Sequence, residues 1–371
     1  MKYNWQQLDW PEFSYDLSAV EDALYQFIEQ MGRLSGVLKA LPADMQMEAI
    51  INTMVAEAIK TSEIEGEYFS RQDVQSSIRN KLGLNTTLEK VQDKRAKGAG
   101  ELMVDVRNTY AEPLTQQKLF HWHKMLLPDS KGIAVGAWRS HEEPMQVISG
   151  AMGKEKVHFE APPSSHVAFE MKRFIKWFND TAPGGTHEIK NAPVVRSAIA
   201  HLYFETIHPF EDGNGRIGRA LSEKVLSQNA GRPILLSLSQ TIEANKKQYY
   251  SALEQAQRSN EITGWIVYFV NMVMDAQKRA EENIDFILYK TQFFDRFKTR
   301  LNERQLKVVK RMLEEGPQGF EGGMNASKYS SITKISKSTA TRDLQELVSI
   351  GAIYPIGGGR STRYGLVLKA N

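Results

Sequence analysis

The sequence predicts a mainly α-helical protein with one short β-hairpin and a smaller C-terminal domain. Apolar residues recur at helical spacing over most of the 371 residues. Two short β-like runs, 145–149 and 156–160, flank a glycine-rich turn and interrupt that pattern. Near residue 300 a new group of short helices and strands begins. We therefore expect three regions, namely residues 1–92, 93–300 and 301–371.

The composition limits the class of protein. The absence of cysteine excludes disulfides and thiolate chemistry and is consistent with a reducing cytoplasm. The first residues lack the apolar run of a leader, and no later run approaches membrane-spanning length, so we expect a cytoplasmic protein without a membrane partner. The net charge of +3 is uneven. Residues 301–371 hold eleven Lys and Arg against six Asp and Glu, so any general affinity for nucleic acid is expected there.

The first two regions are expected to be built from helices. Residues 1–92 predict a small helical region, with strong helical patterns over 17–34 and 44–60. His121 and His123 lie two apart on a later helix and face opposite sides, which favours packing over metal ligation. Further helices are expected over residues 91–109, 114–127, 165–180, 193–207, 217–229, 240–258 and 263–301.

The stretch between the helices 193–207 and 217–229 has the features of an anion site. Gly213 and Gly215 allow backbone N–H groups to turn inward, and the loop leads directly into a helix N-terminus. Arg216 and Arg219 lie three apart in the first turn, so both side chains can face the same anion. Two arginines oppose the helix dipole at this end, a placement that an anion would make favourable.

Two neighbouring residues add chemistry to this anion site. Asp212 supplies a carboxylate beside the phosphate cradle, an arrangement that suits Mg²⁺ held by one protein oxygen together with phosphates and water. His208 can accept a proton near neutral pH. The residues alone thus predict a phosphate or nucleotide site with a metal and a base.

The same stretch, His208-Pro-Phe-Glu-Asp-Gly-Asn-Gly-Arg-Ile-Gly-Arg219, resembles the motif H-P-F-x-[D/E]-G-N-G-R-x-x-R of the Fic family without departure. Fic proteins mostly transfer AMP from ATP to a hydroxyl of a target protein. The resemblance implies a helical Fic core, with His208 as the base, Phe210 as an anchor of the loop and Asp212 as the Mg²⁺ ligand. It also implies phosphate binding by Gly213, Asn214, Gly215, Arg216 and Arg219.

A second resemblance concerns residues 61–66. Thr61, Glu65 and Gly66 occupy the fixed positions of the inhibitory Fic pattern [S/T]-x-x-x-E-[G/N]. Thr61 and Glu65 share one helix face and Gly66 can end the helix, so the Glu65 carboxylate can reach Arg219. The resemblance implies that Glu65 pairs with Arg219 and displaces the γ-phosphate. An acidic, solvated helix end is the alternative.

The resemblance also implies roles for two segments outside the loop. The hairpin 145–160 would be a flap over the active site, whose edge pairs with an extended segment of the target protein. Tyr249 or Tyr250, in the helix 240–258, would stack on adenine, with ordinary core packing as the alternative. Fic proteins often associate with copies of themselves, so a homodimer is compatible with the sequence.

Residues 301–371 resemble a winged helix-turn-helix domain. The helix 338–350 would be the recognition helix, followed by two strands with a basic tip at Arg360 and Arg363. Winged helices bind DNA or dock proteins. A net charge of +5 and few arginines on the recognition helix predict weak DNA affinity, so both roles stay open.

Three functions are compatible with the sequence. The first is a protein adenylyltransferase that uses ATP and Mg²⁺, modifies a Ser, Thr or Tyr hydroxyl of a target protein or of itself, and is inhibited by Glu65. The second is a transcription regulator that senses nucleotide and binds DNA through the winged helix. The third is transfer of another group, such as UMP or phosphocholine, or removal of AMP. The intact His208 favours an enzyme, because nucleotide binding alone needs no base.

Overall fold

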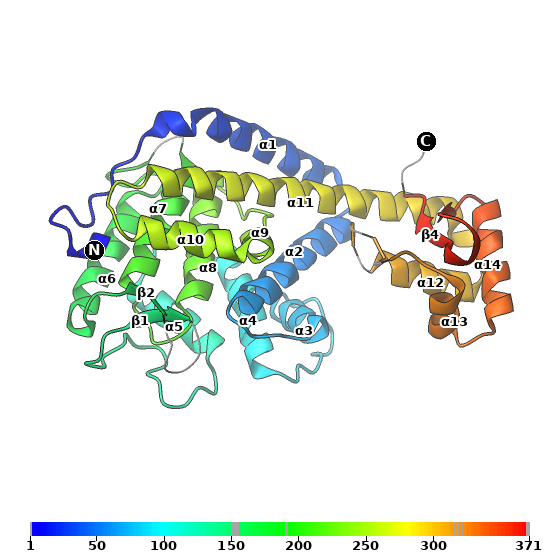
Figure 1. Cartoon of the computed structure of the whole chain (residues 1–371), viewed down its shortest axis with the longest axis horizontal. Helices are drawn as coiled ribbons and strands as arrows, with labels where there is room; N and C mark the ends of the chain where they lie inside the picture. Colours follow the sequence, from blue (N-terminus) through cyan, green and yellow to red (C-terminus); the bar gives the residue numbers. More distant parts are fainter. Residues whose placement is uncertain are drawn as a thin grey trace. The chain divides into compact units, whose positions relative to one another are not determined.

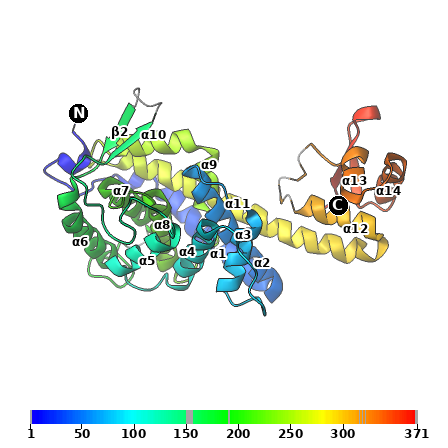
Figure 2. The same ribbon diagram turned by 90° about the horizontal axis from the view of Figure 1, so that it is seen from below.

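The structure is a computed structural model that describes residues 2–149, 156–189, 192–314, 316–317, 319–320 and 322–368. These residues form fourteen α-helices, four short 3₁₀-helices and two separate two-stranded antiparallel sheets (Figures 1 and 2). The mainly helical class is confirmed. Two compact units, residues 1–278 and 279–371, divide the chain. The domain limits at 92/93 and 300/301 remain predictions.

The first unit begins with helices whose bounds follow the sequence pattern. The 3₁₀-helices η1 (Asn4–Gln6) and η2 (Leu17–Ala19) precede α1 (Glu21–Ala40), α2 (Ala43–Ile64) and α3 (Arg71–Lys81). The Oγ of Ser70 caps α3 by accepting from the Asp73 N–H. The helix α2 continues four residues beyond the predicted helical stretch. This extension carries its C-terminal end to Glu65.

The middle of the first unit surrounds a pair of packed helices. α4 (Lys94–Asn108), α5 (Gln116–Leu126) and α6 (Ser164–Asp180) lie around α7 (Pro193–Ile207) and α8 (Asn214–Ala230), which pack against each other. Pro193 occupies the first turn of α7, as the sequence predicts. Almost every side chain of α7 is buried, because other elements cover it on all sides. The loop 208–213 connects these two helices, and its residues Pro209 and Phe210 are buried.

Three more helices complete the first unit. α9 (Leu238–Ala244) packs on α2, and α10 (Lys246–Ala256) follows it; α11 (Thr263–Phe297) contains the boundary between the two units. In Figure 1, α1 runs alongside the first part of α11, and the Gln277 amide donates to the Phe27 carbonyl at 3.2 Å. No helix in the described part of the chain is long and apolar enough to cross a membrane.

The predicted hairpin is present as β1 (Gln146–Ser149) and β2 (Lys156–Glu160). The register pairs Gln146 with Glu160 and contains an irregularity after Val147. The predicted glycine-rich turn lies outside the described residues. The hairpin lies beside α10 in Figures 1 and 2, and the Arg258 guanidinium, just beyond α10, donates to the His158 carbonyl at 3.1 Å.

The second unit has the three helices and two strands expected of a winged helix. Its elements after α11 are η3 (Lys298–Arg300), α12 (Glu303–Leu313), α13 (Ala326–Thr333), α14 (Lys337–Ser349), β3 (Ile353–Ile356), η4 (Gly359–Ser361) and β4 (Arg363–Leu366). The buried Asp343 of α14 accepts hydrogen bonds from the Arg304 guanidinium and the Tyr329 hydroxyl, which ties the three helices together. The side chain of Arg360, at the predicted basic tip, is outside the described part of the structure.

Candidate functional site

The loop 208–213 has a tightly turned backbone at both ends. His208 ends α7 with φ of 49° and ψ of 59°, a left-handed conformation that non-glycine residues rarely adopt. Its N–H donates to the Phe204 carbonyl at 2.9 Å. Gly213 begins the next helix with φ of 83°, which a side chain would disfavour. These two turns reverse the chain between α7 and α8 and keep His208 at the start of the loop.

Asn214 fixes the loop from inside. Its side-chain oxygen accepts from the Phe210 N–H at 2.9 Å, and its amide donates to the Phe210 carbonyl at 2.8 Å. The Asn214 side chain is buried and both of its polar atoms are bound to backbone. The sequence analysis assigned this side chain to phosphate oxygens. In this structure it closes the loop instead, which leaves phosphate binding at this position to the backbone.

Arg139 holds the same loop from outside and was not singled out by the sequence. Its guanidinium is buried and donates to the His208 carbonyl at 2.8 Å, the Ile207 carbonyl at 3.3 Å and the Pro162 carbonyl at 2.5 Å. Burial lowers the pKa of Arg139 to about 10, so the side chain stays charged at neutral pH. No sequence signal identifies this role, because Arg139 lies about seventy residues before the loop.

His123 supports the next part of the loop. The Gly136 N–H donates to its Nδ1 at 2.8 Å, so Nε2 carries the proton and donates to the Asp212 carbonyl at 3.1 Å. The ring stacks on Phe210 with 4.1 Å between centroids. Burial lowers the pKa of His123, which keeps the imidazole neutral. The sequence analysis favoured packing over metal ligation for His121 and His123, but it did not predict this support.

The first turn of α8 is already occupied by a carboxylate. Glu65 lies above Gly215, and a Cβ at position 215 would overlap Glu65 Oε1 and lie 3.2 Å from Glu65 Cδ. N–H groups in a helical first turn have no partner within the helix and attract anions. The carboxylate of Glu65 thus stands where the sequence predicts phosphate oxygens, and Gly215 leaves the space for it.

Arg219 is bound entirely to the end of α2. Its guanidinium donates to the Thr61 hydroxyl at 2.7 Å, the Thr61 carbonyl at 2.9 Å and Glu65 Oε1 at 2.6 Å. Thr61 and Arg219 are buried, whereas the Glu65 side chain is 28% exposed. Burial acts to raise the pKa of Glu65, but the charges of Arg219, Arg216 and Lys246 together lower it, so the carboxylate is ionised at neutral pH.

Arg216 is bound by a different carboxylate. Its guanidinium forms an ion pair with Glu67, and its other terminal nitrogen lies 3.4 Å from both Asp212 oxygens. Arg216 is buried, and the Glu67 side chain is 21% exposed. Glu67 follows Gly66 and therefore lies outside the inhibitory pattern that the sequence analysis described. The structure shows that both arginines of the loop motif are paired with acids from the end of α2.

His208 lies over the buried acid Glu205. Its side chain is 15% exposed, and Nδ1 lies 3.8 Å from Glu205 Oε2. Burial, with a smaller effect of the Arg139 charge, lowers the pKa of His208 to about 4. Burial also raises the pKa of Glu205 to about 8. At neutral pH His208 is therefore a neutral imidazole, the form that accepts a proton.

The Asp212 carboxylate fits the predicted metal ligand. Its side chain is 54% exposed and stands at the loop surface, where its Oδ1 accepts from the Gly213 N–H at 2.6 Å. Within the described residues no group of three His, Cys, Asp or Glu side chains is arranged to hold a metal. A single exposed carboxylate suits Mg²⁺, which commonly binds through one carboxylate and the phosphates of its nucleotide.

The two tyrosines proposed for adenine differ in their surroundings. Tyr249 is buried, and its hydroxyl lies 2.7 Å from Nε2 of the buried His201, so packing accounts for this residue. Tyr250 is 37% exposed, and the Lys246 ammonium lies 5.8 Å from its ring centroid. Burial and the nearby charge of Glu65 raise the pKa of Tyr250. Of the two, only Tyr250 offers an accessible ring near the loop.

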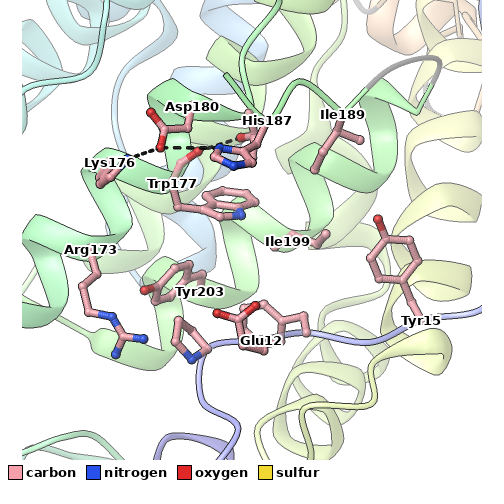
Figure 3. A pocket seen from close by; sticks show the side chains of 13 residues that line it. Glu12, Tyr15, Arg173, Lys176, Trp177, Asp180, His187, Ile189, Ile199 and Tyr203 are labelled. Atoms are coloured by element: carbon pink, nitrogen blue, oxygen red, sulfur yellow. Dashed lines mark hydrogen bonds and ion pairs between the residues drawn. The ribbon is translucent and has the colours of Figure 1, made fainter. Parts of the chain in front are cut away.

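A cavity of about 370 Å³ lies away from this loop. Figure 3 shows it between the N-terminal segment and helices α6 and α7, with Trp177 and Tyr203 on its wall. Asp180 pairs there with Lys176 and lies 3.9 Å from His187. None of the residues of the loop motif lines this cavity. The two arginines of the anion site are instead paired with carboxylates of the chain itself.

The sequence matches three known families. Residues 113–226 match the Fic/DOC family, which covers the loop motif and the helices around it. Residues 3–84 match a domain of unknown function (DUF4172), and this match includes Glu65. Residues 321–367 match the C-terminal domain of DIP2311-like transcriptional regulators, in agreement with the winged-helix fold of this part.

Curated relatives share the Fic part of the chain. Protein adenylyltransferase Fic from Drosophila mojavensis is 29% identical over 193 residues, which are 51% of this chain and 34% of that protein. The protein of the same name from Drosophila grimshawi is 33% identical over 130 residues, which are 35% of this chain and 23% of that protein. The chain thus spans about a third or less of the length of these relatives.

Solved structures share the fold. A Fic family protein from Desulfovibrio desulfuricans aligns over 97% of this chain and 99% of its own, with a TM-score of 0.53 and 18% identity. A Fic domain-containing signaling protein from Bacteroides thetaiotaomicron aligns over 71% of this chain and 95% of its own, with a TM-score of 0.53 and 19% identity.

Proposed function

We propose that this chain, in which residues 113–226 form a domain of the Fic/DOC family, is a protein adenylyltransferase that moves AMP from ATP to a protein hydroxyl. One observation carries the proposal. The loop holds a neutral His208 and an exposed Asp212 beside a helix N-terminus that already binds a carboxylate. This arrangement provides a base, a metal ligand and an anion site within one turn of chain.

The residues of the loop have separate roles in this reaction. His208 accepts the proton of the target hydroxyl as the hydroxyl oxygen attacks the α-phosphorus. The bond between the α-phosphorus and the bridging oxygen breaks, and pyrophosphate leaves. Arg216, Arg219 and the backbone at Gly213 and Gly215 bind the β- and γ-phosphates. Mg²⁺, held by Asp212 and the phosphates, would neutralise charge on the leaving group.

Glu65 inhibits this reaction in the proposal. It occupies the anion position over Gly215 and the guanidinium of Arg219. A triphosphate cannot place its terminal phosphate on Arg219 while Glu65 remains there, because both anions use the same donors. ATP then binds weakly or in a pose that leaves the α-phosphorus badly aligned for attack.

Two contacts with ligands outside the loop complete the proposal. Tyr250 stacks on adenine, since its ring is accessible and lies near Glu65. The hairpin β1–β2 offers a strand edge to the target protein, and Ile148 and Val157 on it are exposed apolar side chains. A homodimer and the cytoplasmic location stay predictions.

The experiment is incubation of the full-length protein with ATP labelled at the α-phosphate and Mg²⁺, followed by a gel. Three variants accompany the wild type, namely Glu65→Ala, His208→Ala and Glu63→Ala. Glu63 is the matched control, because it lies on the same helix end and pairs with Lys60 at 2.5 Å rather than with the loop.

We expect about tenfold more label on Glu65→Ala than on the wild type, since one charge-assisted contact is removed from the inhibited state. Glu63→Ala should match the wild type, and His208→Ala should carry no label. Label on His208→Ala at the wild-type level would refute the role of His208 as the base. Absence of label from every folded, ATP-binding variant would refute adenylyl transfer.

A second function, DNA binding by residues 301–371, has a specific observation in its favour. The match to a transcriptional regulator domain coincides with three helices and two strands, and Arg342 and Gln345 of α14 are exposed. Fluorescence anisotropy with labelled duplex DNA tests it. Binding that weakens with salt and is lost in Arg342→Ala would support it, and no binding at low salt would exclude it.

A further inference from the structure

Two helix ends in this protein carry charges that are unfavourable for their own dipoles. Glu65 caps the C-terminal end of α2 and Glu67 follows two residues later, although the C-terminal end of a helix is negative. The helix α8 begins with Arg216 and Arg219, although its N-terminal end is positive. Each acid pairs with one arginine across the gap. The two ion pairs offset the unfavourable charges at both helix ends. The pair of Glu67 with Arg216 is therefore as much a part of this contact as the pair of Glu65 with Arg219.

The pair formed by Glu67 is well supported on both sides. One Glu67 oxygen contacts the buried Arg216, and the other lies 3.5 Å from the Arg95 guanidinium. Arg95 is in turn 3.0 Å from Asp93 and lies 5.7 Å from the centroid of the Phe69 ring. Glu67 therefore sits between two cations, and Arg95 keeps a partner of its own if Glu67 moves.

The backbone fixes Glu67 in relation to Glu65. Gly66 adopts φ of 83° and donates its N–H to the Glu63 carbonyl at 3.0 Å. The Glu67 N–H donates to the Ser62 carbonyl at 2.9 Å. These two bonds form the helix-ending turn in which glycine reverses the chain. The turn connects both acids rigidly to α2 and directs both side chains to the first turn of α8.

We propose that Glu67 is a second inhibitory carboxylate, which competes with a nucleotide phosphate for Arg216 as Glu65 does for Arg219. The proposal rests on the proposed function in one respect, that the competing ligand is the triphosphate of a nucleotide. ATP must then displace two acids that belong to one turn. Release of either acid alone leaves half of the phosphate site blocked, and movement of the turn frees both arginines together.

The experiment measures the Kd of ATP with Mg²⁺ by titration calorimetry on the full chain. The variants are Glu67→Gln, Glu65→Gln, the double variant and Glu63→Gln as the matched control. We expect about tenfold tighter binding for Glu67→Gln, because its amide keeps the size of the side chain but loses the charge that holds Arg216. The double variant should bind more tightly than either single variant, and Glu63→Gln should bind within about twofold of the wild type.

Three further measurements make the result decisive. Inorganic triphosphate should show the same order of affinities, because the competition concerns phosphates and not the base. Glu67→Asp, which is shorter but still charged, should give a smaller gain than Glu67→Gln, and it serves as the test if Glu67→Gln does not fold. Thermal melting establishes folding of each variant. Unchanged or weaker ATP binding in folded Glu67→Gln would overturn the proposal.

The outcomes separate this inference from the proposed function. Tighter ATP binding by Glu67→Gln without any transfer of label would refute adenylyl transfer and leave the competition for Arg216 in place. Transfer of label by Glu67→Gln with an unchanged Kd for ATP would support adenylyl transfer and refute the competition for Arg216. Failure of every variant, including Glu65→Gln, to bind ATP or triphosphate would overturn both.

Discussion

The loop 208–213 and the turn that ends α2 face each other, yet different kinds of interaction hold them. The loop is fixed by side chains bound to its backbone, namely Asn214 on Phe210 and Arg139 on the His208 carbonyl. The turn reaches α8 through ion pairs between the side chains of Glu65 and Glu67 and the two arginines. A phosphate can replace a carboxylate on arginine, but no ligand replaces the supports of a buried backbone. The first region is thus a permanent scaffold and the second is exchangeable.

The largest expected effect concerns the scaffold. Arg139→Ala leaves the carbonyls of Ile207, His208 and Pro162 without their donor, so the free energy of unfolding should fall by about 3 kcal/mol. Urea unfolding measures it. The control is Arg173→Ala, a more exposed arginine paired with Glu170, for which we expect a loss of less than about 1 kcal/mol. Equal losses for the two variants would contradict the role of Arg139 as a support of the loop.

An intermediate effect concerns the acid beneath His208. The pKa of Glu205 is raised to about 8 in the folded protein, so the unfolded state ionises first as the pH rises above about 4.5. Its contribution to stability is therefore complete below that pH and is lost progressively as the pH rises to 8. Glu205→Gln removes this loss, so the variant should gain on the wild type from pH 5 to 8.

Urea unfolding at pH 5, 6.5 and 8 gives this comparison. Glu63→Gln serves again as control, because Glu63 lies at the end of α2 beside Lys60. A pH-independent difference between Glu205→Gln and the wild type would show that burial does not raise the pKa of this carboxyl in the folded protein.

The smallest expected effect concerns the exchangeable contact. Thr61→Val keeps the shape of the side chain but removes the hydroxyl that accepts from the Arg219 guanidinium at 2.7 Å. The inhibited state alone loses this bond, so labelling with ATP should rise about threefold. Thr53→Val is the matched control, because its hydroxyl bonds only to the Ala49 carbonyl within α2. Labelling that falls in Thr61→Val would show that Thr61 supports the active state.

The contacts that these variants test differ in how far they could be predicted from the sequence. The spacing of Thr61, Glu65 and Gly66 predicted a helix end that carries an acid, because all three residues lie within two helical turns, and the family resemblance added its pairing with Arg219. The loop motif predicted the anion site, the base and the metal ligand for the same reason. Short-range geometry is fixed by backbone periodicity, so residues a few positions apart can be placed from the sequence.

Contacts between residues that are far apart in the sequence could not be predicted in this way. Arg139 and His123 hold the loop from positions about seventy and ninety residues away, and no pattern near them marks that role. Tyr249 and Tyr250 are neighbours in the sequence, yet one is buried against His201 and the other is accessible. Neighbours on a helix point in different directions, and packing decides which of them meets the core.

The sequence by itself determined the helical class, the hairpin, the winged helix and the residues of the loop, because these depend on local periodicity and on one contiguous motif. The family resemblance already implied the pairing of Glu65 with Arg219, and only the tertiary structure showed that Glu67 pairs with Arg216. Glu67 lies one position beyond the inhibitory pattern, and its pairing with Arg216 follows from the turn at Gly66 and from the approach of α2 to α8. That approach is set by burial over the whole first unit, which no short segment encodes.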